Sequence, residues 1–294
     1  MSAVEITHLT KRYGHVTALD DVTLTIDESS ITGILGRNGA GKTVLMSIIT
    51  AQDQPTSGTV RVFGEDPTEN AAVLSRTCFI RDNQRYPDEC KLDHVLRIGR
   101  LFYPNWDDGL ASRIATELDI PTDRHVRKMS RGQLSAVGLL IGMASRAPLT
   151  FFDEPYLGLD ATARTMFYDL LLADYAEHPR TILVSTHLLD EMENLLENCV
   201  LLSRGTMLKH GSIDELRSGG WEVSGAWADL EPLLAGRRVL RERRMGALGI
   251  VIVEGDERFA REARNRGLTV APASLHDLVA AYGLLDHDMA EVAR

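Results

Sequence analysis

One glycine-rich stretch has the residue types and spacing of a phosphate-binding loop. It runs Gly36-Arg-Asn-Gly-Ala-Gly-Lys-Thr43 and fits the pattern G-x-x-x-x-G-K-[ST] at every position. Glycines let such a loop curl until its backbone N–H groups face a phosphate chain, and the helix that follows adds its positive N-terminal end. Lys42 would supply charge to the outer phosphates and Thr43 a hydroxyl ligand for Mg²⁺. We therefore expect a nucleotide site here rather than a glycine-rich turn that fits by chance.

Two adjacent acids supply the second half of that chemistry. The apolar segment Leu149-Thr-Phe-Phe ends in Asp153-Glu154-Pro155. Asp153, at the C-terminal end of a strand, would hold Mg²⁺ through its water shell, and Glu154, one residue further on, would polarise an attacking water. The alternative is a strand that ends in a polar turn. Adjacent acids beside a phosphate loop favour a hydrolase over a protein that only binds nucleotide.

The elements that must position these residues follow an α/β pattern. The short apolar segments Ile31–Leu35, Leu149–Asp153 and Thr181–Ser185 are typical of strands in a helix-covered parallel sheet. Helices are expected at Lys42–Thr50 and Ala161–His178. Further strands are expected at Val4–His8, Val16–Ile26 and Thr59–Phe63, and a helical pattern covers about residues 88–145, with a break at Tyr103-Pro-Asn105.

A third motif, Ser130-Arg-Gly-Gln133, precedes an expected helix. With the glycine-rich loop and Asp153-Glu154-Pro155 it resembles the nucleotide-binding subunit of ABC transporters, over about residues 1–217. The resemblance implies a P-loop ABC ATPase cassette: a RecA-like core sheet, an antiparallel β subdomain and a helical subdomain at about 88–145. It also implies ATP and Mg²⁺ as ligands. Taken alone, a serine before a helix is more commonly an N-cap.

The resemblance assigns roles to individual residues. Tyr13 would stack on adenine, although it could be an ordinary turn tyrosine. Within the loop and the start of its helix, the implied ATP contacts are Gly36, Arg37, Asn38, Gly39, Ala40, Gly41, Lys42, Thr43 and Val44. The implied contacts to ATP on the opposite subunit are Ser130, Arg131, Gly132 and Gln133.

The implied catalytic residues are Glu154, His187 and Gln84, and the implied metal ligands are Thr43, Gln84 and Asp153. His187 follows a strand in Ser-Thr-His and would contact the γ-phosphate; the alternative is a structural histidine. Gln84 would contact Mg²⁺ and the attacking water, or else belong to an exposed polar loop. Asp160, in Gly-Leu-Asp, would lie at the dimer interface, and it could serve at the same time as a helix N-cap.

Arg131 departs from the family pattern, which has glycine at this position. A backbone with positive φ would strain an arginine there. The guanidinium would either add charge near a bound phosphate or point outward. Gly132, nearer the phosphate in the family pattern, is retained.

Composition limits the remaining possibilities. The 294 residues include 32 basic and 42 acidic side chains, a net charge of −10, which argues against a broad nucleic-acid surface. The three cysteines are widely spaced, so no disulfide framework or metal knuckle is expected. The N-terminus lacks the features of a signal peptide, and no apolar run reaches the length of a membrane span. We therefore expect a cytoplasmic chain that would lie on the inner face of the membrane through a partner.

Residues 218–294 are expected to form a small α+β extension. Strands are expected at Trp221–Ala226, Val239–Arg243, Ala247–Val253 and Leu268–Ala271, with helices at Asp229–Ala235 and Asp256–Arg266 and a last helix from Ser274. This order indicates a β-α-β-β-α-β layout. The extension contains 10 arginines and 12 acids, so its basic cluster Arg237–Arg244 is interpreted as a solvated face.

These features together predict an ATPase subunit that drives a membrane ABC transporter. The expected partners are an integral membrane permease and a second nucleotide-binding subunit, identical or similar, closed head to tail around two ATP. The interval Tyr103-Pro-Asn-Trp-Asp107 is similar to bacterial exporters with separate ATPase and permease chains, which favours export. The alternatives are a non-transport ABC ATPase that acts on a ribosomal, DNA or assembly partner, and a sensing module that hydrolyses little ATP.

Overall fold

The fold is given by a computed structural model that describes residues 1–82, 84–186 and 188–292. The N-terminal half contains a three-stranded antiparallel sheet of order β2-β1-β4. Buried and exposed residues largely alternate along β2, as a sheet with one solvated face requires. The strands are β1 (Ser2–Tyr13), β2 (Val16–Asp27) and β4 (Ser57–Val62).

A six-stranded sheet of order β5-β6-β7-β3-β8-β9 lies at the centre of the cassette. It is parallel except for β9, which pairs antiparallel with β8. Every residue of β3, β6 and β7 is buried, because helices and the first sheet cover both faces. The strands are β3 (Ile31–Leu35), β5 (Thr77–Ile80), β6 (Leu149–Asp153), β7 (Thr181–Thr186), β8 (Asn198–Ser203) and β9 (Thr206–Ser212).

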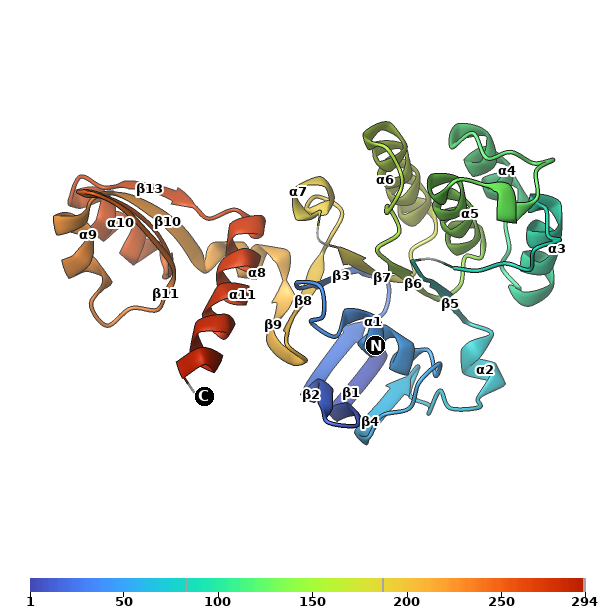
Figure 1. Cartoon of the computed structure of the whole chain (residues 1–294), viewed down its shortest axis with the longest axis horizontal. Coiled ribbons are helices and arrows are strands. Elements are labelled where there is room, and N and C mark those ends of the chain that lie inside the picture. Colours follow the sequence, from blue (N-terminus) through green and yellow to red (C-terminus); the bar gives the residue numbers. More distant parts are fainter. Residues whose placement is uncertain (83, 187, 293–294) are drawn as a thin grey trace.

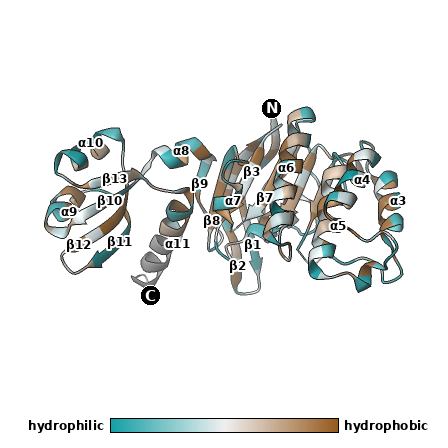
Figure 2. Cartoon of the chain, turned by 90° about the horizontal axis from the view of Figure 1, so that it is seen from above, coloured by the Kyte–Doolittle hydropathy of each residue, from teal (hydrophilic) through white to brown (hydrophobic). Residues whose placement is uncertain are grey.

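The two faces of this sheet belong to two hydrophobic cores. Ile34 and Phe151 point into a core shared with helix α1 (Lys42–Ile49) and the three-stranded sheet. Leu35 and Phe152 point to the opposite face, into a core shared with α5 (Arg131–Ala144) and α6 (Ala161–Glu177). In Figure 2 the hydrophobic colour concentrates on strands such as β3 and β7 between these layers. The short helices of the cassette are α2 (Ala71–Leu74), α7 (Leu189–Met192) and α8 (Ile213–Ser218).

The expected helical region is formed by α3 (Leu92–Phe102), α4 (Asp108–Glu117), a 3₁₀ turn (Val126–Lys128) and α5. The predicted break is confirmed, since α3 ends at Phe102 and Asp107 caps α4. The ring of Trp106 packs directly on Gly99, where an added Cβ would lie 2.3 Å from it. Trp106 therefore serves the packing of this region, whereas Leu101 and Phe102 are 80% and 70% exposed.

The third sheet lies wholly within residues 220–272 and has the order β11-β12-β10-β13. All its neighbouring strands are antiparallel, and the predicted β-α-β-β-α-β sequence of elements is confirmed. Its elements are β10 (Gly220–Ala226), α9 (Trp227–Leu234), β11 (Val239–Met245), β12 (Leu248–Glu254), α10 (Glu257–Asn265) and β13 (Thr269–Pro272), followed by α11 (Leu275–Val292). The division of the chain at residue 217 stays a prediction.

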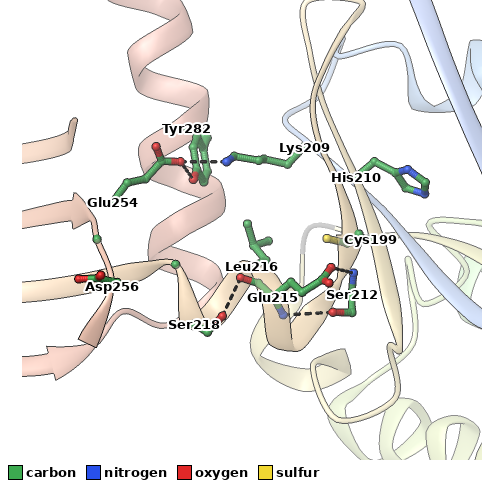
Figure 3. Close-up of a pocket in the computed structure, with 13 residues that line it drawn as sticks. Cys199, Lys209, His210, Ser212, Glu215, Leu216, Ser218, Glu254, Asp256 and Tyr282 are labelled. Atoms are coloured by element: carbon green, nitrogen blue, oxygen red, sulfur yellow. Dashed lines mark hydrogen bonds and ion pairs between the residues drawn. The ribbon is translucent and has the colours of Figure 1, made fainter. Parts of the chain in front are cut away.

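Helix α11 lies between the third sheet and the cassette (Figure 1). It packs against β11 and α7, and its Gly283 lies beside the Arg37 side chain of the glycine-rich loop. Figure 3 shows the junction, where Glu254 at the end of β12 accepts hydrogen bonds from the Tyr282 hydroxyl of α11 and from Lys209 Nζ of β9, the latter at 3.0 Å. No helix among the described residues is both long and apolar enough to cross a membrane.

Candidate functional site

The glycine-rich loop follows β3 and curls through three positive φ angles. These are 143° at Gly36, 82° at Gly39 and 105° at Gly41, a region that side chains other than glycine rarely adopt. The backing of the loop also requires glycine, because a Cβ at Gly36 would lie 2.3 Å from the Leu202 carbonyl oxygen of β8. The loop is held to the β8–β9 turn by the hydrogen bond from Gly205 N to the Ala40 carbonyl, 3.0 Å. Its backbone is thus preorganised.

Lys42 and Thr43 begin α1 and turn their side chains toward the end of β6. Lys42 Nζ donates to the Gly36 carbonyl at 2.8 Å and lies 3.6 Å from Glu154 Oε1. Thr43 Oγ1 donates to Asp153 Oδ2 at 2.7 Å. The structure therefore brings the two halves of the predicted site together, although they are separated by 110 residues along the chain.

Ser185, near the end of β7, joins the two acids. Its hydroxyl donates to Asp153 Oδ1 at 2.7 Å and accepts the backbone N–H of Glu154 at 2.8 Å. Glu154 has a φ of 48°, a left-handed conformation that is uncommon for a residue with a side chain. This turn directs the Glu154 carboxylate back toward Lys42, away from the direction that a continued strand would give it.

Tyr156 fixes the other oxygen of the Glu154 carboxylate. The buried Tyr156 hydroxyl donates to Glu154 Oε2 at 2.6 Å and accepts a hydrogen bond from Thr186 Oγ1, 2.8 Å away. Thr186 is the last residue of β7. His187, predicted to contact the γ-phosphate, lies outside the described residues.

Gln84 and Glu154 line the same small cavity. Gln84 Oε1 accepts the backbone N–H of Arg81 at 3.4 Å within the segment that follows β5, and both residues line this cavity. Arg131 and Ser135, from the start of α5, line this cavity as well. Gln84 therefore lies near Glu154, while its contacts with Mg²⁺ and the attacking water stay a prediction.

The Ser130 motif caps α5. Ser130 Oγ accepts the backbone N–H of Gln133 at 3.2 Å, and Gln133 Oε1 accepts the backbone N–H of Ser130 at 3.0 Å, which is a capping box. Gly132 packs on the loop after Glu154, since an added Cβ would lie 2.4 Å from the Gly158 carbonyl oxygen. Ser135 Oγ donates to the Leu157 carbonyl of the same loop at 2.5 Å. The motif is therefore fastened to the segment that joins Glu154 to Asp160.

Arg131 is not strained. It is the first residue of α5 and is absent from the described residues with positive φ, so the strain that a positive φ would impose on an arginine does not arise. Its guanidinium extends to the carboxylate of Asp82, with Nη2 at 3.2 and 3.3 Å from the two oxygens. The helical backbone at the start of α5 accommodates any side chain. The particular feature of Arg131 is that its guanidinium is directed at Asp82.

Tyr13 ends β1 with 48% of its surface exposed. Its hydroxyl donates to Asp53, just beyond α1, and that hydrogen bond raises the pKa of Tyr13. Lys11 Nζ binds the other Asp53 oxygen at 2.6 Å and lies 4.7 Å from the centre of the Tyr13 ring. Burial alone would raise the pKa of Asp53, but the hydrogen bonds from Lys11 and Tyr13 outweigh it and lower that pKa. The ring is thus held in one orientation on the surface.

Asp160 is the N-cap of α6, and its side chain accepts the Ala163 backbone N–H at 2.8 Å. It is exposed, so the N-cap function leaves it available for a second contact. The interface role of Asp160 stays a prediction. Val44, behind the loop, packs against the core between the two cassette sheets.

Sequence reasoning missed four residues that the structure places around the site: Ser185, Tyr156, Asp53 and Lys11. Tyr156 carries the clearest signal, because a tyrosine two residues after a candidate base is placed to bind it. Ser185 lies in a predicted strand, where a hydroxyl that follows three apolar residues also suggests a specific partner. Asp53 and Lys11 carry no comparable signal in the sequence.

The donor set fits magnesium bound with a nucleotide. Thr43 Oγ1 and Asp153 Oδ2 are hard oxygen donors close enough to share one cation, and Mg²⁺ commonly takes few protein ligands together with water and phosphate oxygens. Among residues 1–82, 84–186 and 188–292, no group of three or more His, Cys, Asp and Glu side chains could form an all-protein metal cage. A nucleotide-dependent magnesium site does not need one.

Comparison with known proteins agrees with this geometry. Residues 19–157 match the family described as ABC transporter. The ABC transporter ATP-binding protein YtrB of Bacillus subtilis is 26% identical, over 95% of this chain and 98% of its own length. The aliphatic sulfonates import ATP-binding protein SsuB 1 of Nocardia farcinica is 32% identical, over 69% of this chain and 79% of its own.

The daunorubicin/doxorubicin resistance ATP-binding protein DrrA of Streptomyces peucetius is 29% identical, over 74% of this chain and 67% of its own length. Among solved structures, an ATP binding subunit of an ABC transporter superposes with a TM-score of 0.66. That structure is 24% identical in sequence and covers 74% of this chain and 92% of its own. At this level of sequence identity, the similarity to that structure shows a shared fold.

Proposed function

Since the chain belongs to the ABC transporter ATP-binding family and is an ABC ATPase, we propose that it powers a membrane transporter through ATP-driven closure of a head-to-tail dimer. The observation that supports this proposal best is the continuous chain of contacts from Thr43 through Asp153 and Ser185 to Glu154. It links a phosphate-binding loop to a positioned acid, which is the arrangement that nucleotide hydrolysis needs and simple binding does not.

In the proposed reaction each side chain has a separate task. The loop N–H groups and Lys42 bind the phosphates and neutralise charge as the terminal phosphoryl group leaves. Glu154 accepts a proton from the attacking water, and Tyr156 holds the carboxylate in one orientation. Thr43, Asp153 and Gln84 are the residues that would hold Mg²⁺, which would supply charge neutralisation on the phosphate oxygens. His187 is proposed to contact the γ-phosphate.

The placement of Ser130 and Gly132 supports the proposed dimer. Ser130 and the N-terminus of α5 are exposed, and this 14-residue helix directs its positive end outward. We propose that this end, with Arg131 and Gln133, contacts ATP held by the loop of a second subunit, while Asp160 lies at the interface. The second subunit is an identical or a similar chain.

We propose an integral membrane permease as the second partner, which places the chain on the inner face of the membrane. The exposed Leu101 and Phe102, beside the Tyr103–Asp107 interval, offer apolar surface in the helical region. Export is the proposed direction. The interval Tyr103–Asp107 and the resistance function in the name of DrrA support it, whereas SsuB 1 is named for import.

Recovery of partners from native membranes tests the transporter role. The Glu154→Gln chain is incubated with ATP and Mg²⁺ in detergent-solubilised membranes and recovered by affinity, and the Lys42→Ala chain serves as the matched control. We expect a multi-span membrane protein at near-equal stoichiometry with Glu154→Gln. Recovery of only ribosomal, DNA-associated or assembly proteins would contradict the transport role and leave the ATPase in place.

A further inference from the structure

Arg131 adds a positive charge at the end of the helix that is proposed to meet the partner subunit's ATP. Its backbone does not have positive φ, so no glycine is required at this position and a long side chain is accommodated without strain. That side chain is 58% exposed and is the first of α5, directly after the Ser130 cap. A guanidinium in this place suits a phosphate, because its planar set of donors can bind two phosphate oxygens.

In the structure the Arg131 guanidinium is turned to its own subunit. It binds both oxygens of Asp82, which is 25% exposed and lies two residues beyond β5 and two residues before Gln84. The pair therefore ties the start of α5 to the segment that carries Gln84. Asp82, Gln84 and Arg131 also line one cavity with Glu154.

We propose that Asp82 is a positioning residue that binds the Arg131 guanidinium before the dimer closes. As the dimer closes, Arg131 leaves Asp82 and binds the terminal phosphate of the partner subunit's ATP. This inference rests on the proposed head-to-tail dimer and assigns a regulation to it. The Asp82 carboxylate and the triphosphate compete for one guanidinium. ATP wins because it carries more negative charge and a helix N-terminus lies beside it.

The exposure of the Arg131 and Asp82 side chains sets the free energy that their ion pair contributes. A partly exposed pair contributes a modest free energy, which corresponds to a factor of about three in an equilibrium constant. A symmetric dimer contains the exchange twice, so the two factors multiply to about ten. Asp82 therefore raises the dissociation constant of the ATP-bound dimer about tenfold. Removing the Asp82 charge leaves Arg131 available to the phosphate. Removing Arg131 abolishes both the contact with Asp82 and the proposed contact with the phosphate.

The test measures the ATP-dependent dimer dissociation constant by analytical ultracentrifugation in the full-length Glu154→Gln background with ATP and Mg²⁺. Asp82→Asn, Arg131→Gly, Arg131→Lys and the Asp82→Asn/Arg131→Gly double variant are compared. Glu117→Gln, which breaks the exposed Arg113–Glu117 pair of α4, is the matched control. Circular dichroism of each variant checks that it is folded.

We expect Asp82→Asn to dimerise about tenfold more tightly than its parent and Arg131→Gly to dimerise more weakly. Arg131→Lys should remain between Arg131→Gly and the parent, and Asp82→Asn should have no effect when Arg131 is glycine. Tightening by Asp82→Asn that persists in the double variant overturns the exchange, as does an unchanged dissociation constant. If Asp82→Asn does not fold, tighter dimerisation of Arg131→Gly overturns it. Absence of any ATP-dependent dimer contradicts the proposed dimer itself.

Discussion

At the scale of single residues, the site depends on hydrogen bonds that fix side-chain direction. Tyr156 and Ser185 bind the carboxylate and the backbone of Glu154, so the acid has one orientation before any substrate arrives. Asp53 does the same for the ring of Tyr13. Preorganisation of this kind lowers the cost of ordering a site when ligand binds.

The Tyr13 tether leads to a kinetic prediction. Asp53→Ala removes the acceptor of the Tyr13 hydroxyl and leaves Lys11 Nζ with the Gln54 carbonyl, so the proposed adenine-stacking ring becomes mobile. We expect KM for ATP to rise about three- to tenfold with kcat little changed, because the loss concerns binding that is equal in the ground and transition states. Tyr13→Phe should act in the same direction. Steady-state ATPase assays measure both constants.

Asp66→Ala is the control for this prediction, since Asp66 accepts its hydrogen bond from Thr68 within an exposed turn. A normal KM for Asp53→Ala would show that the tether does not serve nucleotide binding. A fall in kcat at constant KM would show that the effect is on the chemical step.

At the scale of elements, the site depends on close backbone packing between α5 and the loop after β6. Gly132→Ala places a methyl group 2.4 Å from the Gly158 carbonyl oxygen, so one of the two segments must move. Overpacking of this kind typically costs about 1–3 kcal/mol. We expect ATPase activity to fall about tenfold or more while the circular dichroism spectrum is unchanged.

Gly219→Ala is the matched control, because a Cβ there meets its nearest neighbour, the Glu215 carbonyl oxygen, at 3.6 Å. This variant should keep its ATPase activity. Full activity of Gly132→Ala would mean that the packing of α5 on the Gly158 loop has no functional consequence.

The elements also show what the sequence could predict. Ile31–Leu35 and Leu149–Asp153 were predicted with their observed bounds, because fully buried strands are short, largely apolar segments with clear ends. Thr77–Ile80, Asn198–Ser203 and Thr206–Ser212 were missed. The first has only four residues, and the pairing of β8 with β3 and of β9 with β8 depends on tertiary contacts.

The same limit applies to the site. The loop and the acids are local motifs, so their residue types and spacing were sufficient to find them. The partners Ser185 and Asp53 lie 32 and 40 residues from Asp153 and Tyr13, and only the fold brings them together. The sequence could not decide whether the backbone at Arg131 has positive φ, and only the structure shows that α5 begins there in an ordinary helical conformation.

At the scale of the whole molecule, the extension contacts the nucleotide-binding part of the chain through α11. This helix packs against α7 and lies beside Arg37 of the glycine-rich loop. The junction contains Glu254, which contacts Lys209 and Tyr282 (Figure 3). Arg238 Nη1 lies 3.2 Å from the other Glu254 oxygen. Burial raises the pKa of Glu254, but the hydrogen bonds from Tyr282 and Lys209 outweigh it, so that its pKa lies below the ordinary value.

A lowered pKa predicts how the stability of the junction depends on pH. Because Glu254 is more acidic folded than unfolded, its contribution is complete above the unfolded pKa of about 4.3 and is lost as pH falls through the lower folded pKa. Glu254→Gln should therefore lower the free energy of unfolding at pH 7, and the difference from wild type should shrink below about pH 4.5. Urea denaturation at a series of pH values measures it.

Glu242→Gln, at an exposed position of β11, is the control and should change the free energy of unfolding little at any pH. A Glu254→Gln deficit that stays constant from pH 7 to pH 4 would contradict an ionised Glu254 at the junction.

The central claim is that Glu154 activates water at a preformed ATP site, and ATP turnover by Glu154→Gln tests it most directly. The assay uses purified chain at saturating ATP and Mg²⁺, with bound nucleotide quantified in the same samples. We predict that Glu154→Gln binds ATP as well as wild type and turns it over at least about a hundredfold more slowly, the scale of a lost general base. Near-normal turnover by Glu154→Gln would contradict the account.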